Sequence, residues 1–422
     1  MACNLPAPRL RARWRRWKAS DWGDGYFWAE QASDLNWETG SGTAAESHAG
    51  TYLMLALTLA AGTLLLLAWG VYPLAVHMLA SLRRVRRLPL PDSPPTVTVV
   101  IATREDGDLV SARVRDALAA DYPGDLLNVV VALDQTAAAG TKDIDCREPR
   151  ATIVQGDAPG GKAAALNAGV RAARGEILVF TDTHQRFEPD AISALVRALG
   201  DRSFGAVSGQ LELPETGHRS LVEHYWRFER RLRRDEARLH SSIGVSGSIY
   251  AMRREFWVPL PAGLILDDLY IPMRLILDGH RVGFDDSARA HDSRRPAVEQ
   301  EFQRKVRTLT GNFQLCAWLP SVLVPWRNPV WLSFLLHKLL RLLTPWLGLA
   351  FLVGVAGLAL RAWGWWALAA ASGLALIGLL LAELLGLRRR LVSYLRWAWT
   401  MQAAVAVATM NGLTGRWNVW RQ

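Results

Sequence analysis

Residues 175–184 read Gly-Glu-Ile-Leu-Val-Phe-Thr-Asp-Thr-His. The centre of this stretch is a short apolar run with the length and composition of a buried β-strand. Three polar residues follow it directly, at Asp182, Thr183 and His184. In an open α/β sheet, ligands bind at the carboxyl ends of the strands. The stretch therefore predicts both a central strand and the edge of the sheet at which a site would lie.

Three similar runs precede this strand, at Thr96–Ala102, Leu127–Asp134 and Ala151–Gln155. Helical patterns accompany them, one over Lys162–Arg174 and one over residues 189–200, and each of these stops at a glycine, which commonly ends a helix. Strands that alternate with helices predict an α/β fold, with a mostly parallel sheet and helices on both faces.

Apolar segments flank this pattern. Residues 51–80, 343–360 and 363–381 are each almost continuously apolar, and about 20 such residues suffice to span a bilayer as a helix. Four arginines between residues 83 and 87 follow the first segment, so the positive-inside rule places the next domain in the cytosol of an inner-membrane protein. The predicted organisation is a disordered tail at 1–50, a transmembrane helix at 51–80, a cytosolic domain at 91–325, an amphipathic interfacial helix at 326–342, and a membrane region at 343–422 with two or three helices.

Composition agrees with a membrane protein. The chain has 422 residues, a formal net charge of +10 and 19 tryptophans, and indole rings favour the bilayer interface. No helix-turn-helix, RNP or zinc-finger pattern accompanies the basic charge, so we expect membrane lipids rather than nucleic acid as its partners. The three cysteines are isolated and predict neither a disulfide framework nor a metal site.

Asp182 and His184 are the first candidate site residues. Side chains two apart in an extended segment point the same way, so the carboxylate and the imidazole can share one divalent cation, Mn²⁺ or Mg²⁺. Such an ion would neutralise charge on a diphosphate leaving group. A solvated His184 beside an aspartate that caps the next helix is the competing interpretation.

Asp267 and Asp268 are the second pair. They follow the apolar run Leu264–Leu266, and one of them can act as general base while the other orients the site. Their competing interpretation is an N-cap for the helix predicted over Leu269–Leu277.

Other segments supply weaker signals. Gly160, Gly161 and Lys162 open a helix that also carries Asn167, and a helix N-terminus favours phosphate, although the spacing is not that of a Walker motif. Gly247 and Ser248 are small residues that suit a wall close to a sugar. The cationic stretch from Gln303 to Arg307 suits a diphosphate or, equally, a membrane surface.

The ordered set of these segments resembles the membrane-bound branch of glycosyltransferase family 2. The resemblance extends from about Thr96 to Arg341. Its matching segments are Val99–Ala102 with Glu105, Asp121–Pro123, Val129–Asp134, Gly161–Gly169, Gly175–Asp182, Gly247–Arg253, Asp267–Asp268 and Gly279–Phe284.

The resemblance implies a GT-A fold and an inverting transfer from a nucleotide-sugar, with a UDP-sugar expected, to a lipid-linked or polysaccharide acceptor. By position in the family, Glu105 and Asp134 would contact uracil and ribose. Thr103 stands at the end of the same strand as Glu105 and would belong to the same nucleotide-sugar site. Asp182 and His184 would stand at the metal-binding motif and Asp268 at the base. Gln303, Arg304 and Arg307 would correspond to the family's Gln-x-x-Arg-Trp.

Two departures from the family pattern leave alternatives open. His184 replaces the second aspartate of the metal motif, which keeps a non-catalytic nucleotide-binding membrane protein as one alternative. A processive polysaccharide synthase, with a channel built by few helices, by an oligomer or with a partner subunit, is the other. Val306 and Thr308 stand where a tryptophan that helps to hold the growing polymer would follow an arginine in processive members, which argues against processivity here. A standalone transporter or channel is disfavoured, because few helices can span and the polar domain is large.

Overall fold

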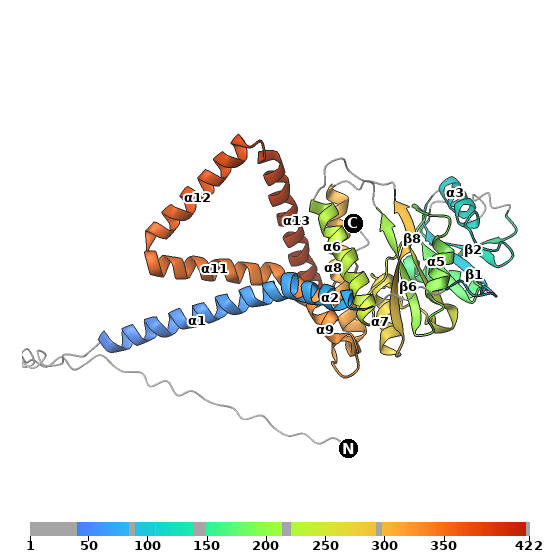
Figure 1. The fold of residues 1–422 in the computed structure, drawn as a ribbon, viewed down its shortest axis with the longest axis horizontal. Coiled ribbons are helices and arrows are strands. Elements are labelled where there is room, and N and C mark those ends of the chain that lie inside the picture. Colours follow the sequence, from blue (N-terminus) through green and yellow to red (C-terminus); the bar gives the residue numbers. More distant parts are fainter. Residues whose placement is uncertain are drawn as a thin grey trace, which may run out of the picture. The chain divides into compact units, whose positions relative to one another are not determined.

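The computed structural model describes residues 40–83, 89–105, 107–137, 148–212, 221–292 and 298–418 (Figure 1). The chain divides into two units, Met1–Tyr52 and Leu53–Gln422. Of the first unit, only the beginning of helix α1 (Gly40–Leu66) is described, so most of the predicted tail lies outside the described residues. All contacts given below lie within the second unit.

One eight-stranded sheet forms the centre of the second unit. Its strand order is β3-β2-β1-β4-β7-β6-β8-β5. The strands are β1 (Val97–Thr103), β2 (Leu127–Leu133), β3 (Ala151–Gln155), β4 (Ile177–Thr181), β5 (Gln185–Phe187), β6 (Phe204–Glu212), β7 (Tyr250–Arg253) and β8 (Arg281–Asp292). The first four in this order are parallel, β7 is antiparallel to both its neighbours, β6 and β8 are parallel, and β5 is antiparallel to β8. The four strands predicted from sequence are β1 to β4, and each lies within one residue of its predicted ends, which for the fourth strand are Glu176 and Asp182.

Helices cover both faces of the sheet, as predicted. They are α3 (Gly107–Leu118), α4 (Lys162–Ala172), α5 (Ala191–Ala198), α6 (Leu221–Leu239), α7 (Asp267–Leu277) and α8 (Val298–Trp318). Residues alternate between the two faces along a strand, so Val99 of β1 packs in one core with α3 and α5, whereas Val100 packs in the other with α4, α7 and α8. This two-sided burial explains why the central strands are continuously apolar.

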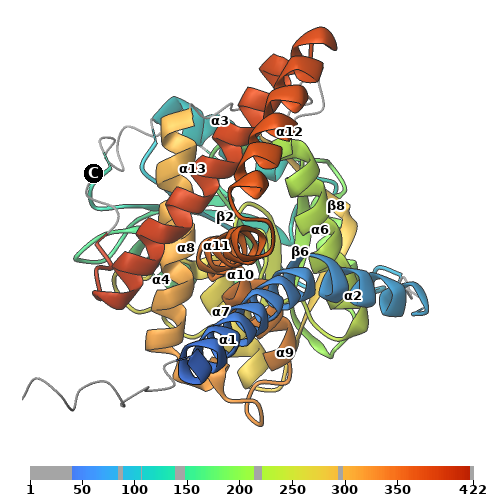
Figure 2. The ribbon, with the colours of Figure 1, turned by 90° about the vertical axis from the view of Figure 1, so that its left-hand side faces the viewer.

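Three helical stretches among the described residues are long and apolar enough to cross a membrane: His48–Ser81, Thr344–Trp363 and Trp365–Leu384. The first joins α1, the π-helical η1 (Leu67–Val71) and α2 (Tyr72–Ser81), and the others are α11 and α12. The final helix, α13 (Arg388–Leu413), lies beside α8 (Figure 2), where Asn411 Nδ2 donates to Thr310 Oγ1 at 3.3 Å.

The segment predicted as an interfacial helix at 326–342 consists of three short pieces that begin at Trp331. They are α9 (Trp331–Ser333), the π-helical η4 (Phe334–Leu339) and α10 (Leu340–Leu342). Phe334 and His337 are fully buried within the protein. This segment therefore packs against α6 within the second unit, and its location at a membrane surface stays a prediction.

Candidate functional site

Most of the predicted site residues meet at the carboxyl edge of the parallel strands. Asp134 follows β2, Asp182 follows β4, and Thr103 ends β1. The first turns of α4 and α7 reach the same edge, since their first residues, Lys162 and Asp267, contact each other there beside Asp182. Residues far apart in sequence are thus gathered by the parallel arrangement, as expected for an open α/β sheet.

Lys162 joins two carboxylates at this edge. It is the first residue of α4, and its Nζ lies 3.1 Å from Asp182 Oδ1 and 3.4 Å from Asp267 Oδ2. Although burial alone would lower it, the two carboxylates raise the pKa of Lys162 above its ordinary value. The residue predicted to face phosphate is therefore an ammonium shared between two aspartates, whose negative charge it partly neutralises.

Asp268 stands beside this pair in the first turn of α7. Leu266, and not an aspartate, occupies the N-cap position, so the capping interpretation does not account for the two carboxylates. Burial and the charge of Asp267 raise the pKa of Asp268 to about 6. A carboxylate with a pKa near the working pH is suited to general-base chemistry.

The loop before β7 forms the wall of this centre. A Cβ added at Gly247 would lie 3.4 Å from the Asp268 Cβ, so glycine allows the loop backbone to lie close to the base. Ser248 Oγ donates to Asp182 Oδ2 at 3.5 Å. Both predicted small residues therefore border the carboxylates, which agrees with a wall close to a reacting group.

A second group of polar contacts lies on the β1–β2 side. Asp134 is almost fully buried and accepts from Arg104 Nε at 2.8 Å and from the Thr136 N–H at 3.0 Å. Burial raises the pKa of Asp134, but the N–H groups of Thr136 and Gly161 and the Arg104 guanidinium together hold it below its ordinary value. Asp134 is therefore a carboxylate held by hydrogen bonds at the carboxyl edge of the sheet.

His184 belongs to this second group. Its Nε2 lies 2.9 Å from Glu105 Oε1, and Thr183 Oγ1 donates to Thr103 Oγ1 at 2.7 Å between the two strand ends. The imidazole thus pairs with Glu105, while Asp182 pairs with Lys162. In this arrangement the two predicted metal ligands have different partners.

Four further predicted residues lie along α4 and α8, outside these two groups of contacts. Asn167 Nδ2 donates to the Leu260 carbonyl at 2.9 Å and its Oδ1 accepts from the Leu260 N–H at 2.8 Å, so its amide holds a loop. On α8, Gln303 and Arg304 are exposed. Arg307 is partly buried. Burial and the charge of Arg304 lower the pKa of Arg307, whereas Asp268, Asp267 and Asp182 act to raise it. Arg307 of this stretch therefore interacts electrostatically with the carboxylate centre.

The structure adds residues that the sequence did not indicate. Tyr250 of β7 is fully buried, its ring centroid lies 4.7 Å from that of Phe180, and its hydroxyl has no hydrogen-bond partner among the residues described. Arg233 of α6 and Lys338 of η4 both lower the pKa of Asp268. No local motif marks these two cations, because they come from helices that reach the site only in the folded chain.

The donor set at Asp182 and Asp267 fits a divalent metal ion. Both are carboxylates, which Mg²⁺ and Mn²⁺ accept, and their oxygens already converge on one cationic group, the Lys162 ammonium. His184 pairs with Glu105 as Asp182 and Asp267 pair with Lys162, so each of the three residues would exchange its present partner to hold an ion.

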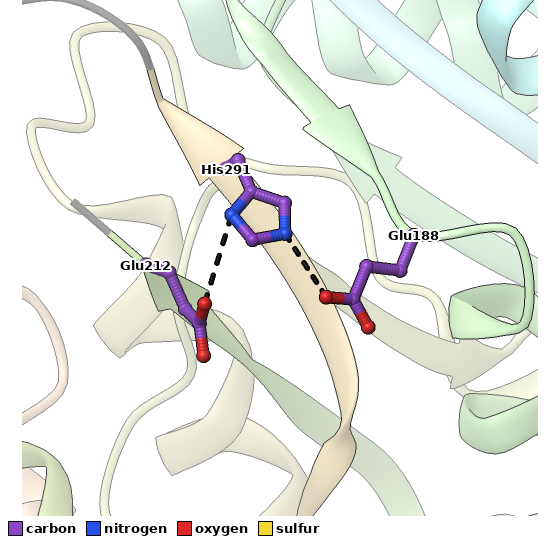
Figure 3. Close-up of side chains that lie close together, drawn as sticks. All are labelled: Glu188, Glu212 and His291. Carbon is purple, nitrogen blue, oxygen red and sulfur yellow. Dashed lines mark hydrogen bonds and ion pairs between the residues drawn. The ribbon is translucent and has the colours of Figure 1, made fainter. Parts of the chain in front are cut away.

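Another set of possible ligands, Glu188, Glu212 and His291, lies where β5, β6 and β8 end or begin (Figure 3). His291 Nε2 lies 3.1 Å from Glu188 Oε1 and its Nδ1 lies 3.6 Å from Glu212 Oε2, so the carboxylates face opposite edges of the ring. Arg289 approaches both carboxylates at 3.9 Å. This arrangement suits an ion-paired bridge between strands better than a shared metal ion.

Comparisons with known proteins agree with this geometry. An N-acetylglucosaminyltransferase of Rhizobium meliloti (strain 1021) is 27% identical over 140 residues, which are 31% of this chain and 33% of that protein. The match thus spans about a third of the relative. A solved structure, the mannosyltransferase PcManGT from Pyrobaculum calidifontis in complex with GDP-Man and Mn²⁺, covers 87% of this chain and 99% of its own at 23% identity and a TM-score of 0.64.

This structural likeness confirms the predicted GT-A-type fold. Residues 94–311 match the family described as "Glycosyltransferase like family 2", and this range includes every predicted site residue and slightly more than half of the chain. The chain belongs to glycosyltransferase-like family 2.

Proposed function

We propose that this protein transfers a sugar, with inversion at the anomeric carbon, from a nucleotide-sugar to a lipid-linked or glycan acceptor at the membrane. The observation that carries the proposal is the meeting of Asp182, Asp267 and Asp268 with Lys162 at one sheet edge. The mannosyltransferase of similar fold binds GDP-Man and Mn²⁺, which supports a nucleotide-sugar and a divalent ion here. The resemblance to the family suggests a UDP-sugar, so both UDP- and GDP-sugars are candidates.

In the proposed reaction, an acceptor hydroxyl attacks the anomeric carbon while the bond from that carbon to the diphosphate oxygen breaks. Asp268 takes the hydroxyl proton, for which its pKa of about 6 is suited. Gly247 and Ser248 border the reacting centre. Lys162 and Arg307 are the cations placed to face the negative charge of the departing diphosphate.

Asp182 and Asp267 would hold the divalent ion, Mn²⁺ or Mg²⁺, which when bound supplies positive charge for the diphosphate. Asp134, Arg104, Glu105 and His184 would then line the nucleoside side, where their mutual contacts anchor them to the ends of β1 and β2. Thr103 supports this side by its contact with Thr183.

We place the catalytic domain on the cytosolic side of an inner membrane. The arginines that follow the first apolar stretch support this orientation through the positive-inside rule. The three apolar helices support a multi-pass protein.

The test is release of nucleoside diphosphate by the purified full-length protein in detergent. A panel of UDP- and GDP-sugars is supplied with Mn²⁺ or Mg²⁺ and with a lipid extract as acceptor. We expect release with one donor, its loss with a chelator, and its loss in Asp268→Asn. Asp278→Asn is the matched control, because Asp278 lies at the opposite end of α7. Failure to release nucleotide from any donor, or equal activity of the two variants, would contradict the proposal.

A further inference from the structure

Helix α13 packs against α6 and α8 at points far apart along its length (Figure 2). In its first half, the Trp397 ring centroid lies 6.0 Å from that of Tyr225 in α6. Near its end, a Cβ added at Gly412 would lie 2.5 Å from Phe313 Cγ of α8, so glycine allows the two helices to lie close together. The neighbouring Asn411 also bonds to α8. These contacts are about 21 Å apart along the helix axis.

The two faces of α13 have different surroundings. The inner face includes Ala404, Val405 and Ala408, which are buried. On the other side lie large apolar side chains that are between 49% and 78% exposed. We call them the outer face of α13, and they are Val392, Leu395, Trp399, Met410 and Leu413. At 3.6 residues per turn, these five positions fall within about 60° of the helix circumference, opposite the inner face. No described residue covers this apolar stripe.

The inner face shows that α13 does not cross a membrane in this arrangement. A spanning helix needs apolar surroundings over about 30 Å. Helices α6 and α8, against which α13 lies, carry many charged residues, and Arg227, Arg231 and Arg304 among them are exposed. In addition, α13 is not one of the three stretches of the described chain that are apolar enough to cross.

The outer face has the chemistry of a lipid contact. Helix α13 begins at Arg388, soon after the candidate span α12 ends at Leu384, so its outer face continues from a membrane segment. Arg396 is exposed at the margin of this face, and an arginine there can extend to lipid headgroups. Trp399 is 77% exposed, and indole rings favour the bilayer interface.

A second copy of the chain fits this face less well. Helix α13 contains arginines but no acidic residue. Two copies paired through their outer faces would bring Arg396 into an apolar contact without a carboxylate from this helix, and an unpaired buried charge is costly.

We propose that α13 is a membrane-surface helix that lies parallel to the bilayer, with its outer face at the boundary between headgroups and acyl chains. Its inner face then holds α8 at this surface. Helix α8 in turn contacts the segment directly before Asp267, because Gln314 Oε1 accepts from the Ile265 N–H at 2.8 Å. The packing of α13 on α8 thereby sets how far the carboxylates of α7 stand from the bilayer.

The experiment measures the depth of nitroxide labels in the full-length protein, placed in nanodiscs of phosphatidylcholine and phosphatidylglycerol. Depth is obtained from collisions with oxygen and with a water-soluble nickel chelate. Labels are attached in turn to Val392→Cys, Trp399→Cys and Leu413→Cys. The native cysteines are first replaced by Cys3→Ser, Cys146→Ser and Cys316→Ala. We expect all three labels about 5–10 Å below the headgroups, at depths that agree within about 3 Å.

A spanning α13 would instead place the label at position 399 about 10 Å deeper than the label at position 392, which would overturn the inference. Labels that the nickel chelate reaches freely, or labels that are immobile and protected from both reagents, would overturn it as well. They would show a face open to water or covered by protein. Val353→Cys and Trp363→Cys on α11 are the control, because labels on this candidate span should differ in depth by about 15 Å.

A second measurement uses the wild-type protein and so needs no substitution. A photoreactive diazirine is placed on the lipid acyl chain, either near the headgroup or at the chain end. The shallow probe should label the outer face of α13 along its whole length, and the deep probe should label α11 and α12 but not α13. Deep labelling at Trp399, or no labelling of α13 by either probe, would overturn the inference. None of these results depends on sugar transfer, so the proposed function is tested separately.

Discussion

The pH dependence of sugar transfer tests the assignment of Asp268 most directly. Burial and Asp267 raise its pKa to about 6, whereas an unperturbed aspartate titrates near 3.9. Only the ionised carboxylate can accept a proton, so activity is present above this pKa and is lost as the pH falls through it. The ionised fraction is about 90% at pH 7 and about 10% at pH 5, so kcat/KM should fall about tenfold between them.

The assay is the initial rate of nucleoside diphosphate release, measured from pH 5 to pH 8 at constant ionic strength and saturating metal. One substitution identifies the titrating group. Arg233→Met removes a positive charge that lowers the pKa of Asp268, so the acid limb of the profile should move to higher pH.

A limb with its midpoint near pH 4 would refute the reasoning, because it would mean that Asp268 is not perturbed. A limb near pH 6 that Arg233→Met does not move would refute it as well, since the titrating group would then lie elsewhere.

Three further predictions concern single residues. Asp268→Asn should lower the transfer rate by about 10²- to 10⁴-fold while nucleotide affinity stays within a few-fold, and joint loss of binding in calorimetry would argue against its role as base. Asn167→Ala should lower the free energy of unfolding by about 1–3 kcal/mol without changing the donor KM, because both amide groups bond to Leu260, and a raised KM would instead indicate a role in binding. Gly354→Ala should lower the melting temperature in detergent, because a Cβ there would collide with Thr58 Oγ1 of α1. Gly348→Ala on the same helix is the control, because a Cβ at Gly348 meets open space. Equal melting temperatures of the two variants would show that α1 and α11 do not pack as described.

Much of the fold could be predicted because its signals are local. Each central strand is a short apolar run that ends in a polar residue, so β1 to β4 were identified with their ends. The strands β5 to β8 were not, because they lack a clear apolar run. Strand β5 has only three residues, and β8 carries charged residues along much of its length.

The segment at 326–342 shows the same limit. Its amphipathic pattern predicted one helix on a membrane surface, since periodicity reports which face is apolar but not what covers it. In the structure its helical part runs without a gap from Trp331 to Leu342 with a π-helical centre at Phe334–Leu339, and the polar residue His337 is fully buried between two glutamates of α6. A charged contact partner about a hundred residues away leaves no mark in a local pattern.

The candidate site likewise depends partly on local sequence signals and partly on contacts made only in the folded chain. By itself, the sequence determined that acidic residues stand at the end of β4 and at the start of α7, because strand ends and helix starts carry local signals. Only the tertiary structure decided that Lys162 bridges Asp182 and Asp267, that His184 turns to Glu105, and that cations of α6 and η4 act on Asp268. The physical reason is that electrostatic interactions depend on distance in space, whereas periodicity records only distance along the chain.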